Sequence, residues 1–210
     1  LRMSGEQKLK DGDEIIQELE FTNNCDLLFF TDKCQVYKAK ADDFAQTKAS
    51  VLGDYVAAKL GFDEGENAVK MVVTKDYKGM LLFAFENGKA AKVPLESYAT
   101  KTNRKKLTGA YSDKSPLVGL LYMPEDEEVL FKASSGNMLL VHTGLLALKT
   151  TRSTQGVAVL KPKKGHRLFS VERYKEGTFT NPKRYRTASL PARGALPVSD
   201  DSKNEQLSLI

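Results

Sequence analysis

With 210 residues, of which 41% are hydrophobic, the chain is long enough for one large domain or two small ones with a buried core. Two cysteines, Cys25 and Cys34, argue against a disulfide framework, and the absence of a long apolar run argues against a membrane span, so a cytoplasmic location is expected. The net charge of +5 permits a nucleic-acid partner but does not require one.

Short apolar runs separated by polar turns dominate the chain from its start, and these favour strands over helices. A turn at residues 9–13 is followed by a first set of expected strands, and a second and a third set come later. The expected strands are residues 13–21, 26–30, 35–40, 68–74, 80–85, 89–94, 128–133 and 137–143.

Three of these strand pairs form a repeated hairpin phrase. The central turn position is occupied by Cys34, then by Gly88 and by Gly136, 54 and 48 residues further on. Glycine suits such turns because it tolerates positive φ, and cysteine is less permissive. A repeat of about 50 residues built from short strands is typical of propeller-like folds.

Each hairpin is followed by a longer polar segment and then by another short apolar stretch. Each of these stretches is expected to form a strand, and they are residues 51–60, 117–123 and 156–160. The pattern predicts an all-β, propeller-like fold over residues 1–171, with about three four-stranded blades of about 50 residues each and an N-terminal remnant of another repeat.

The character of the sequence changes after Val171. Residues 173–193 are rich in Lys and Arg and show little apolar periodicity, and residues 194–210 carry Asp200, Asp201 and Glu205. This composition predicts a flexible tail over residues 172–210, basic at first and then weakly acidic. Its acidic residues could compete with a nucleic acid for basic surfaces, although an inert tail is an equally simple interpretation.

Acidic clusters recur at the same place in each repeat. They comprise residues 11–14, 63–66 and 125–128. A catalytic or metal site is needed once, whereas a solvated turn is needed in every repeat, so we interpret the clusters as turns. His142 and His166 have no partner at metal-ligand spacing, and no nucleophile elbow or phosphate-binding loop is present. The sequence therefore indicates no catalytic residue, no metal and no cofactor.

Two basic segments follow the second hairpin strand of their repeats. The candidate DNA-binding residues in them are Lys101, Arg104, Lys105, Lys106, Lys149, Arg152, Lys161, Lys163, Lys164 and Arg167. Equivalent positions in a propeller-like disc lie at comparable places on its rim, so the two segments could neutralise successive phosphates of a bent duplex. The simpler alternative is an ordinary solvated loop, and the first repeat supports it, because acids outnumber bases over residues 40–54.

Nothing in the sequence indicates base-specific reading, because neither an aromatic ladder nor a recognition helix accompanies the basic residues. Contacts to the DNA backbone with little sequence specificity are the expected mode. A second function stays open at this point, in which the blades form a protein-interaction scaffold and the basic loops only make it soluble.

Three segments resemble one known family. Residues 148–160, with Arg152-Ser153-Thr154-Gln155-Gly156-Val157, are similar to the last blade of the C-terminal domain in the A subunits of bacterial type IIA topoisomerases, namely DNA gyrase and topoisomerase IV. Residues 98–106 resemble the basic loop of the preceding blade, and residues 30–37 resemble the family's strand phrase. The resemblance covers roughly residues 1–171.

This resemblance implies a β-pinwheel, a disc whose blades exchange strands and whose rim binds and bends double-stranded DNA. It implies two protein partners, a breakage-reunion core and a separate ATPase B subunit, where the parent enzyme would use ATP and Mg²⁺. The glycine-rich gyrase box of the family is absent from these residues, so gyrase and topoisomerase IV are not distinguished.

Overall fold

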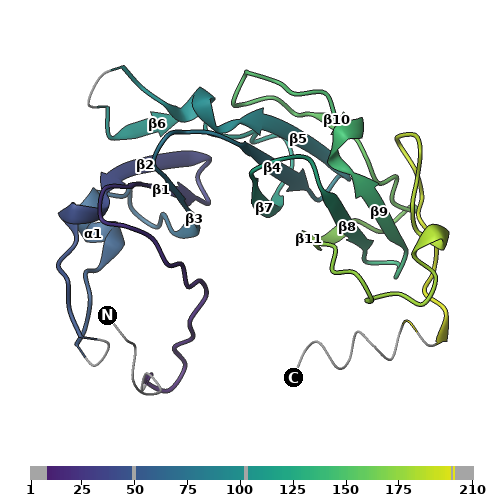
Figure 1. The fold of residues 1–210 in the computed structure, drawn as a ribbon, viewed down its shortest axis with the longest axis horizontal. Coiled ribbons are helices and arrows are strands. Elements are labelled where there is room, and N and C mark those ends of the chain that lie inside the picture. Colours follow the sequence, from purple (N-terminus) through teal and green to yellow (C-terminus); the bar gives the residue numbers. More distant parts are fainter. Residues whose placement is uncertain (1–8, 49–50, 102–103, 200, 202–210) are drawn as a thin grey trace. The chain divides into compact units, whose positions relative to one another are not determined.

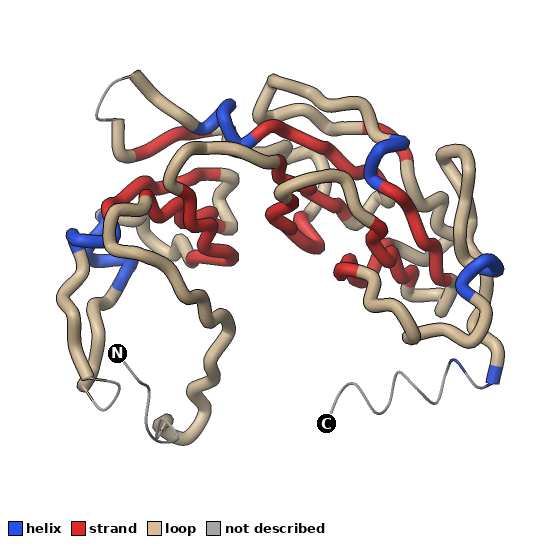
Figure 2. Tube along the Cα trace, in the orientation of Figure 1, coloured by secondary structure: helices blue, strands red, loops and turns tan. Residues whose placement is uncertain are grey.

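The computed structural model describes residues 9–48, 51–101, 104–199 and 201, which are built mainly from short antiparallel strands (Figures 1 and 2). The contacts divide the chain into two compact units. The first comprises residues 1–76 and 100–110, and the second comprises residues 77–99 and 111–210. The chain therefore passes from the first unit to the second, returns to the first for residues 100–110, and then completes the second.

The first unit contains one four-stranded antiparallel sheet with the strand order β3-β1-β2-β6. A 3₁₀ turn, η1 (Ala41–Asp43), follows β2, and a short helix, α1 (Val56–Leu60), lies between β2 and β3. The strands are β1 (Asp26–Thr31), β2 (Gln35–Lys40), β3 (Ala68–Thr74) and β6 (Lys106–Thr108).

The second unit contains a four-stranded sheet, β10-β5-β4-β7, and a three-stranded sheet, β11-β8-β9. Its 3₁₀ turns are η2 (Leu95–Tyr98), η3 (Thr143–Leu145) and η4 (Pro182–Arg184). The strands are β4 (Met80–Phe85), β5 (Lys89–Pro94), β7 (Leu117–Met123), β8 (Glu128–Ala133), β9 (Met138–His142), β10 (Val157–Ala158) and β11 (Leu168–Arg173).

Both four-stranded sheets are completed by a strand that comes from later in the chain. β6 follows η2 in the sequence but pairs with β2, with Val36 opposite Leu107. β10 follows η3 but pairs with β5, with Val157 opposite Ala90. An unpaired sheet edge exposes backbone donors and acceptors, and these exchanged strands satisfy them. The exchange of strands expected from the family resemblance is thus present.

The hairpin turns have the backbone conformation that the repeat predicts. Gly88 and Gly136 have φ of 81° and 82°, and Cys34 occupies the same position with φ of 55°. The strand boundaries predicted around these turns agree with the structure. Six strands match the predicted ranges in full, namely β2, β3, β4, β5, β7 and β8.

Two predicted strands are wrong. Residues 13–21 form no strand, because the side-chain amide of Gln17 rather than a backbone ladder bonds to β3: its Nε2 donates to the Met71 carbonyl and its Oε1 accepts from the Met71 N–H. Residues 51–60 contain α1 instead of a strand. The helix formers Ala57, Ala58 and Lys59 favour it, and Gly61 ends it with φ of 65°.

Residues 172–199 and 201 are packed against the third sheet, where a flexible tail was expected. The side chains of Phe179 and Tyr185 are buried on Leu130 and Leu140. Backbone bridges join Met138 to Ala195 and Leu140 to Arg186, along the edge of β9. The segment therefore lies where an exchanged strand lies in the other two sheets, and the expected boundary at residue 171 falls inside β11.

The two sheets of the second unit share one apolar core. Phe131 and Val141 of the third sheet pack with Leu82 and Met123 of the second. The strands β7 and β11 approach closely, since a β-carbon on Gly119 would lie 2.2 Å from Cγ1 of Val171. In the described part of the chain, no helix is long and apolar enough to cross a membrane.

Candidate nucleic-acid interface

The first basic segment lies in the first unit and is held at the edge of β2. The Lys38 N–H donates to the Lys105 carbonyl at 2.7 Å, directly before the pairing of β2 with β6 begins. Lys101, Arg104 and Lys105 are exposed to solvent. The strand exchange therefore fixes the backbone of a cationic loop on a sheet from an earlier repeat.

Lys106 differs from its neighbours because it is part of the packed structure. Its Nζ lies 2.9 Å from both carboxylate oxygens of Asp63 and 5.3 Å from the ring centre of Tyr37. The hydrogen bonds to Asp63 and Tyr37 raise the pKa of Lys106. A lysine already paired with a carboxylate contributes less to phosphate binding than an exposed one.

The acidic cluster at residues 63–66 is more than the solvated turn that was expected. Glu66 is buried and accepts hydrogen bonds from the side chains of Thr31, Gln35 and Tyr37. Burial by itself would raise the pKa of Glu66, but these bonds, with the Asp63 N–H, hold it below its usual range. The cluster thus connects the loop before β3 to β1 and β2.

The second basic segment lies in the second unit, between β9 and β11. Lys149, Lys161, Lys163, Lys164 and Arg167 are exposed, and the Nε of Arg167 lies 3.7 Å from a carboxylate oxygen of Glu86. The Lys149 N–H donates to the Lys92 carbonyl at 2.9 Å, so this loop is also attached to the preceding sheet.

Arg152 contributes a positive charge to this segment and also holds it in place through a hydrogen bond. Its Nη1 donates to the Ser97 carbonyl at 3.0 Å, and its Nε is buried. The guanidinium thereby ties the loop to η2. The sequence showed the charge of Arg152 but not this contact, because Ser97 is 55 residues away.

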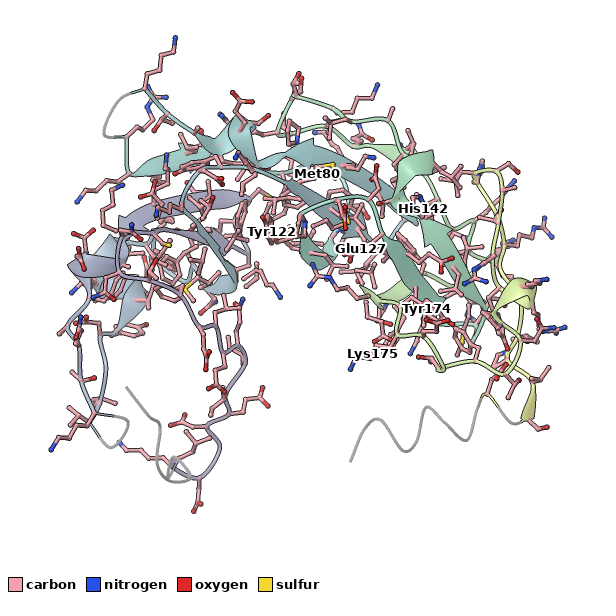
Figure 3. The ribbon with its side chains drawn as sticks, in the orientation of Figure 1. Met80, Tyr122, Glu127, His142, Tyr174 and Lys175 are labelled. Carbon is pink, nitrogen blue, oxygen red and sulfur yellow. The ribbon has the colours of Figure 1, made fainter. Side chains whose placement is uncertain are left out.

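The C-terminal segment adds cations that were expected to lie in a flexible tail. Lys175, labelled in Figure 3 beside Tyr174, is exposed, as are Lys183, Arg184 and Arg193. Other cations of the segment are paired: Arg173 bonds to Glu127 at 2.8 Å, and Arg186 bonds to both carboxylate oxygens of Glu128. Asp201 is buried and accepts hydrogen bonds from Tyr185 and Thr180, whereas Asp200 and Glu205 lie outside the described residues.

No group of three or more His, Cys, Asp or Glu side chains that could hold a metal ion occurs among the described residues. His142 accepts a hydrogen bond from the Gly144 N–H through its Nδ1, and the Nδ1 of His166 lies 3.3 Å from the hydroxyl of Ser134. The exposed cations of each basic segment can bind anions.

Comparison with known proteins shows relatives in sequence, although no family model matches. The chain is 27% identical over 171 residues to the A subunit of DNA gyrase from Mycobacterium bovis (strain BCG / Pasteur 1173P2), covering 80% of this chain and 20% of that protein. It is also 27% identical over 182 residues to the A subunit of DNA gyrase from Streptomyces coelicolor, covering 82% of this chain and 21% of that protein. The chain thus spans about a fifth of the length of these curated relatives.

Two solved structures with the same fold are C-terminal domains of topoisomerase IV and of ParC. The C-terminal domain of DNA topoisomerase IV aligns with a TM-score of 0.76 at 21% identity, covering 90% of this chain and 64% of that one. The C-terminal domain of E. coli ParC aligns with a TM-score of 0.68 at 14% identity, covering 91% and 84%. The chain is a sequence relative of the DNA gyrase A subunit and has the β-pinwheel fold, which confirms the resemblance and the fold class expected from the sequence.

Proposed function

We propose that this chain is the DNA-wrapping module of a type II topoisomerase A subunit, and that it binds and bends the duplex segment to be transported. The observation that carries the proposal is the placement of two cationic loops. Each follows the second strand of a hairpin and lies next to an exchanged strand, once in each unit, in a chain related to the DNA gyrase A subunit. Residues 101–105 precede β6, and residues 149–167 lie on both sides of β10.

The proposed mechanism is neutralisation of phosphates by exposed cations on a preformed scaffold. Lys101, Arg104 and Lys105 act in the first unit, with Lys106 as a weaker contributor. Lys149, Lys161, Lys163, Lys164 and Arg167 act in the second unit, where Arg152 holds the loop. Contacts of this kind bind any sequence and release counterions, so the affinity falls steeply with salt.

The remaining parts of the reaction belong to other domains and subunits in this proposal. Strand cleavage takes place in a breakage-reunion core, and ATP with Mg²⁺ is used by an ATPase B subunit, in the cytoplasm. The module itself needs no cofactor, because phosphate contacts and bending involve no covalent step.

The test is binding to two unrelated duplexes of equal length at two salt concentrations. Micromolar-scale binding at low salt is expected for backbone contacts. The double variant Arg104→Ala/Lys105→Ala should weaken binding to both duplexes equally and should flatten the salt dependence. Lys106→Ala is measured separately, because it also removes the ion pair with Asp63.

Loss of affinity for one duplex alone would contradict the backbone-contact mechanism. Absence of salt-dependent binding to either duplex would favour the alternative function, a protein-interaction scaffold whose basic loops only keep it in solution. The double variant is compared with the unchanged chain by thermal unfolding, so that a folding defect is not mistaken for a binding defect.

A further inference from the structure

A pocket of about 360 Å³ opens beside β2 within the first unit. It is lined by Asp26, Lys38, Ala39, Lys40, Asp43, Thr100, Arg104 and Lys105. Thr100, Arg104 and Lys105 reach this position because β6 pairs with β2, so the pocket is assembled by the strand exchange. A volume of about 300 Å³ or more is typical of small-ligand sites in proteins.

The lining of the pocket is cationic. Its four Lys and Arg side chains face two carboxylates, which leaves an excess of two positive charges. Both carboxylates interact with Lys40, because Asp26 forms an ion pair with its ammonium and Asp43 accepts from its backbone N–H at 2.9 Å. Asp26 also interacts with Lys38, so the excess of two positive charges belongs to the lining of the pocket as a whole.

Lys38 lines this pocket, is half-buried, and donates through its Nζ to the Thr100 hydroxyl at 3.0 Å. Burial lowers the pKa of Lys38, with a further lowering from Lys40 and a partial compensation from Asp26. An anion in the pocket would stabilise its charged form.

The second unit offers an internal comparison. Lys92 occupies the position in β5 that Lys38 occupies in β2, and its Nζ is buried against Asp126 at 2.8 Å and the Thr143 carbonyl at 2.9 Å. In that sheet a protein carboxylate lies against the lysine. In the first sheet a pocket with three further cations lies beside the equivalent lysine.

We propose that this pocket binds one phosphate group through Lys38, Arg104 and Lys105. The phosphate comes either from the DNA backbone or from a free phosphate ion. The DNA source rests on the proposed function, whereas binding of the free ion does not. Lys38 would then be a phosphate-binding residue that lies on a strand, outside the basic loops.

The first arm of the test titrates inorganic phosphate into the whole chain and follows backbone amide NMR signals. Saturable shifts at residues 38–40 and 100–105 are expected, and they should be lost in Lys38→Met. The control variant is Lys48→Met, which removes the same charge from an exposed residue of the same unit outside the pocket. If Lys38→Met lowers the melting temperature, Arg104→Gln/Lys105→Gln replaces it, because both side chains are exposed.

The second arm measures duplex binding against salt. If the backbone supplies the phosphate, Lys38→Met should bind roughly tenfold more weakly than Lys48→Met. The slope of log affinity against log salt should also fall by about 0.9, as for the loss of one phosphate contact.

The two arms separate this inference from the proposed function. Phosphate shifts without a change in DNA binding would assign the pocket to the free ion and would uphold the inference. Absence of phosphate shifts together with equal DNA affinities for Lys38→Met and Lys48→Met would overturn it and would leave the DNA-wrapping function untouched.

Discussion

At the residue scale, the first hairpin turn carries a conformational conflict. Cys34 has φ of 55°, where the equivalent Gly88 and Gly136 have 81° and 82°. A β-carbon in the left-handed region clashes with the following carbonyl and costs about 1–2 kcal/mol. The first repeat therefore tolerates a strain that the other two repeats avoid.

We expect Cys34→Gly to stabilise the first unit by about 1 kcal/mol, because glycine removes this strain and the gain exceeds the extra entropy of the unfolded chain. Urea unfolding measures the change in the free energy of unfolding. The matched control is Cys34→Ala, which keeps the β-carbon and should show no such gain. Equal stability of the glycine and alanine variants would contradict the argument.

Glu66 shows how a single buried carboxylate makes stability depend on pH. The pKa of Glu66 is lowered in the folded state. Its contribution to the free energy of unfolding is therefore complete above the unfolded-state pKa, and it is lost as the pH falls through the folded-state pKa. We expect the first unit to lose stability below about pH 4.3, the ordinary pKa of glutamate.

Glu66→Gln tests this dependence by thermal unfolding from pH 7 to pH 3. The variant should be less stable by about 1–3 kcal/mol at pH 7, since the amide cannot accept all the hydrogen bonds that the carboxylate accepts. As the pH falls below about 4.3, the ordinary pKa of glutamate, its stability should fall less than that of the unchanged chain, because the amide takes up no proton. Parallel pH profiles would show that other carboxylates dominate.

At the element scale, the exchanged strands position the candidate site. β6 and β10 are short, yet each closes a sheet edge and attaches the basic segment that precedes or surrounds it. The approach of β10 to β5 is close at Gly156, where a β-carbon would lie 2.0 Å from the Ala90 carbonyl oxygen. The backbone of the loop therefore contacts the sheet directly.

Gly156→Ala and Gly165→Ala form a matched pair that measures this docking. Both glycines have positive φ, 70° and 79°, but a β-carbon on Gly165 meets nothing within 4 Å. Gly165→Ala should cost about 1 kcal/mol from backbone strain alone. Gly156→Ala should cost at least about 2 kcal/mol more, because the loop has to move off β5.

Calorimetric unfolding compares the two variants, and DNA binding provides a second readout. If β10 positions the cations of residues 149–167, Gly156→Ala should also weaken duplex binding, while Gly165→Ala should not. Similar unfolding free energies for both variants would show that the loop does not depend on this close approach.

At the scale of the whole molecule, the C-terminal segment completes the third sheet. The Met138 N–H and carbonyl exchange hydrogen bonds with Ala195 at 2.8 and 2.9 Å, and the Leu140 N–H donates to the Tyr185 carbonyl at 2.8 Å. Asp201 accepts from the Tyr185 hydroxyl at 2.5 Å and from the Thr180 N–H at 2.8 Å. Acid competition by Asp201 for a basic surface is therefore not expected, because this carboxylate is buried inside the segment.

Two truncations test the role of this segment. Deletion of residues 195–210 removes the bridge to β9 and the buried Asp201, and should destabilise the second unit by about 3 kcal/mol. It should also promote self-association through the exposed edge of β9. Deletion of residues 202–210 is the control, and the difference between the two truncations measures the contribution of residues 195–201. Sedimentation measures the self-association, and thermal unfolding measures the loss of stability. Equal melting temperatures and equal sedimentation of the two truncations would refute a structural role for residues 195–201.

The sequence by itself determined the hairpins and the repeat. Strand alternation and turn residues act over fewer than about ten residues, so β2, β4 and β5 could be bounded from local pattern alone. The positions of the exposed cations followed in the same way, because charge in a polar loop is a local property. The helix-forming residues before Gly61 are also a local pattern, but the strand repeat led to the prediction of a strand over residues 51–60.

Only the tertiary structure decided which strands pair across the repeats and which charged side chains are occupied. The pairing of β6 with β2, the contact of Arg152 with Ser97, and the burial of Glu66 and Asp201 all join residues far apart in the sequence. Such contacts depend on which sheet edge is left open and on which buried polar groups need partners. Open edges and buried polar groups exist only once the chain is folded. Local composition therefore identified Arg152 as a DNA-binding cation and residues 172–210 as a flexible tail.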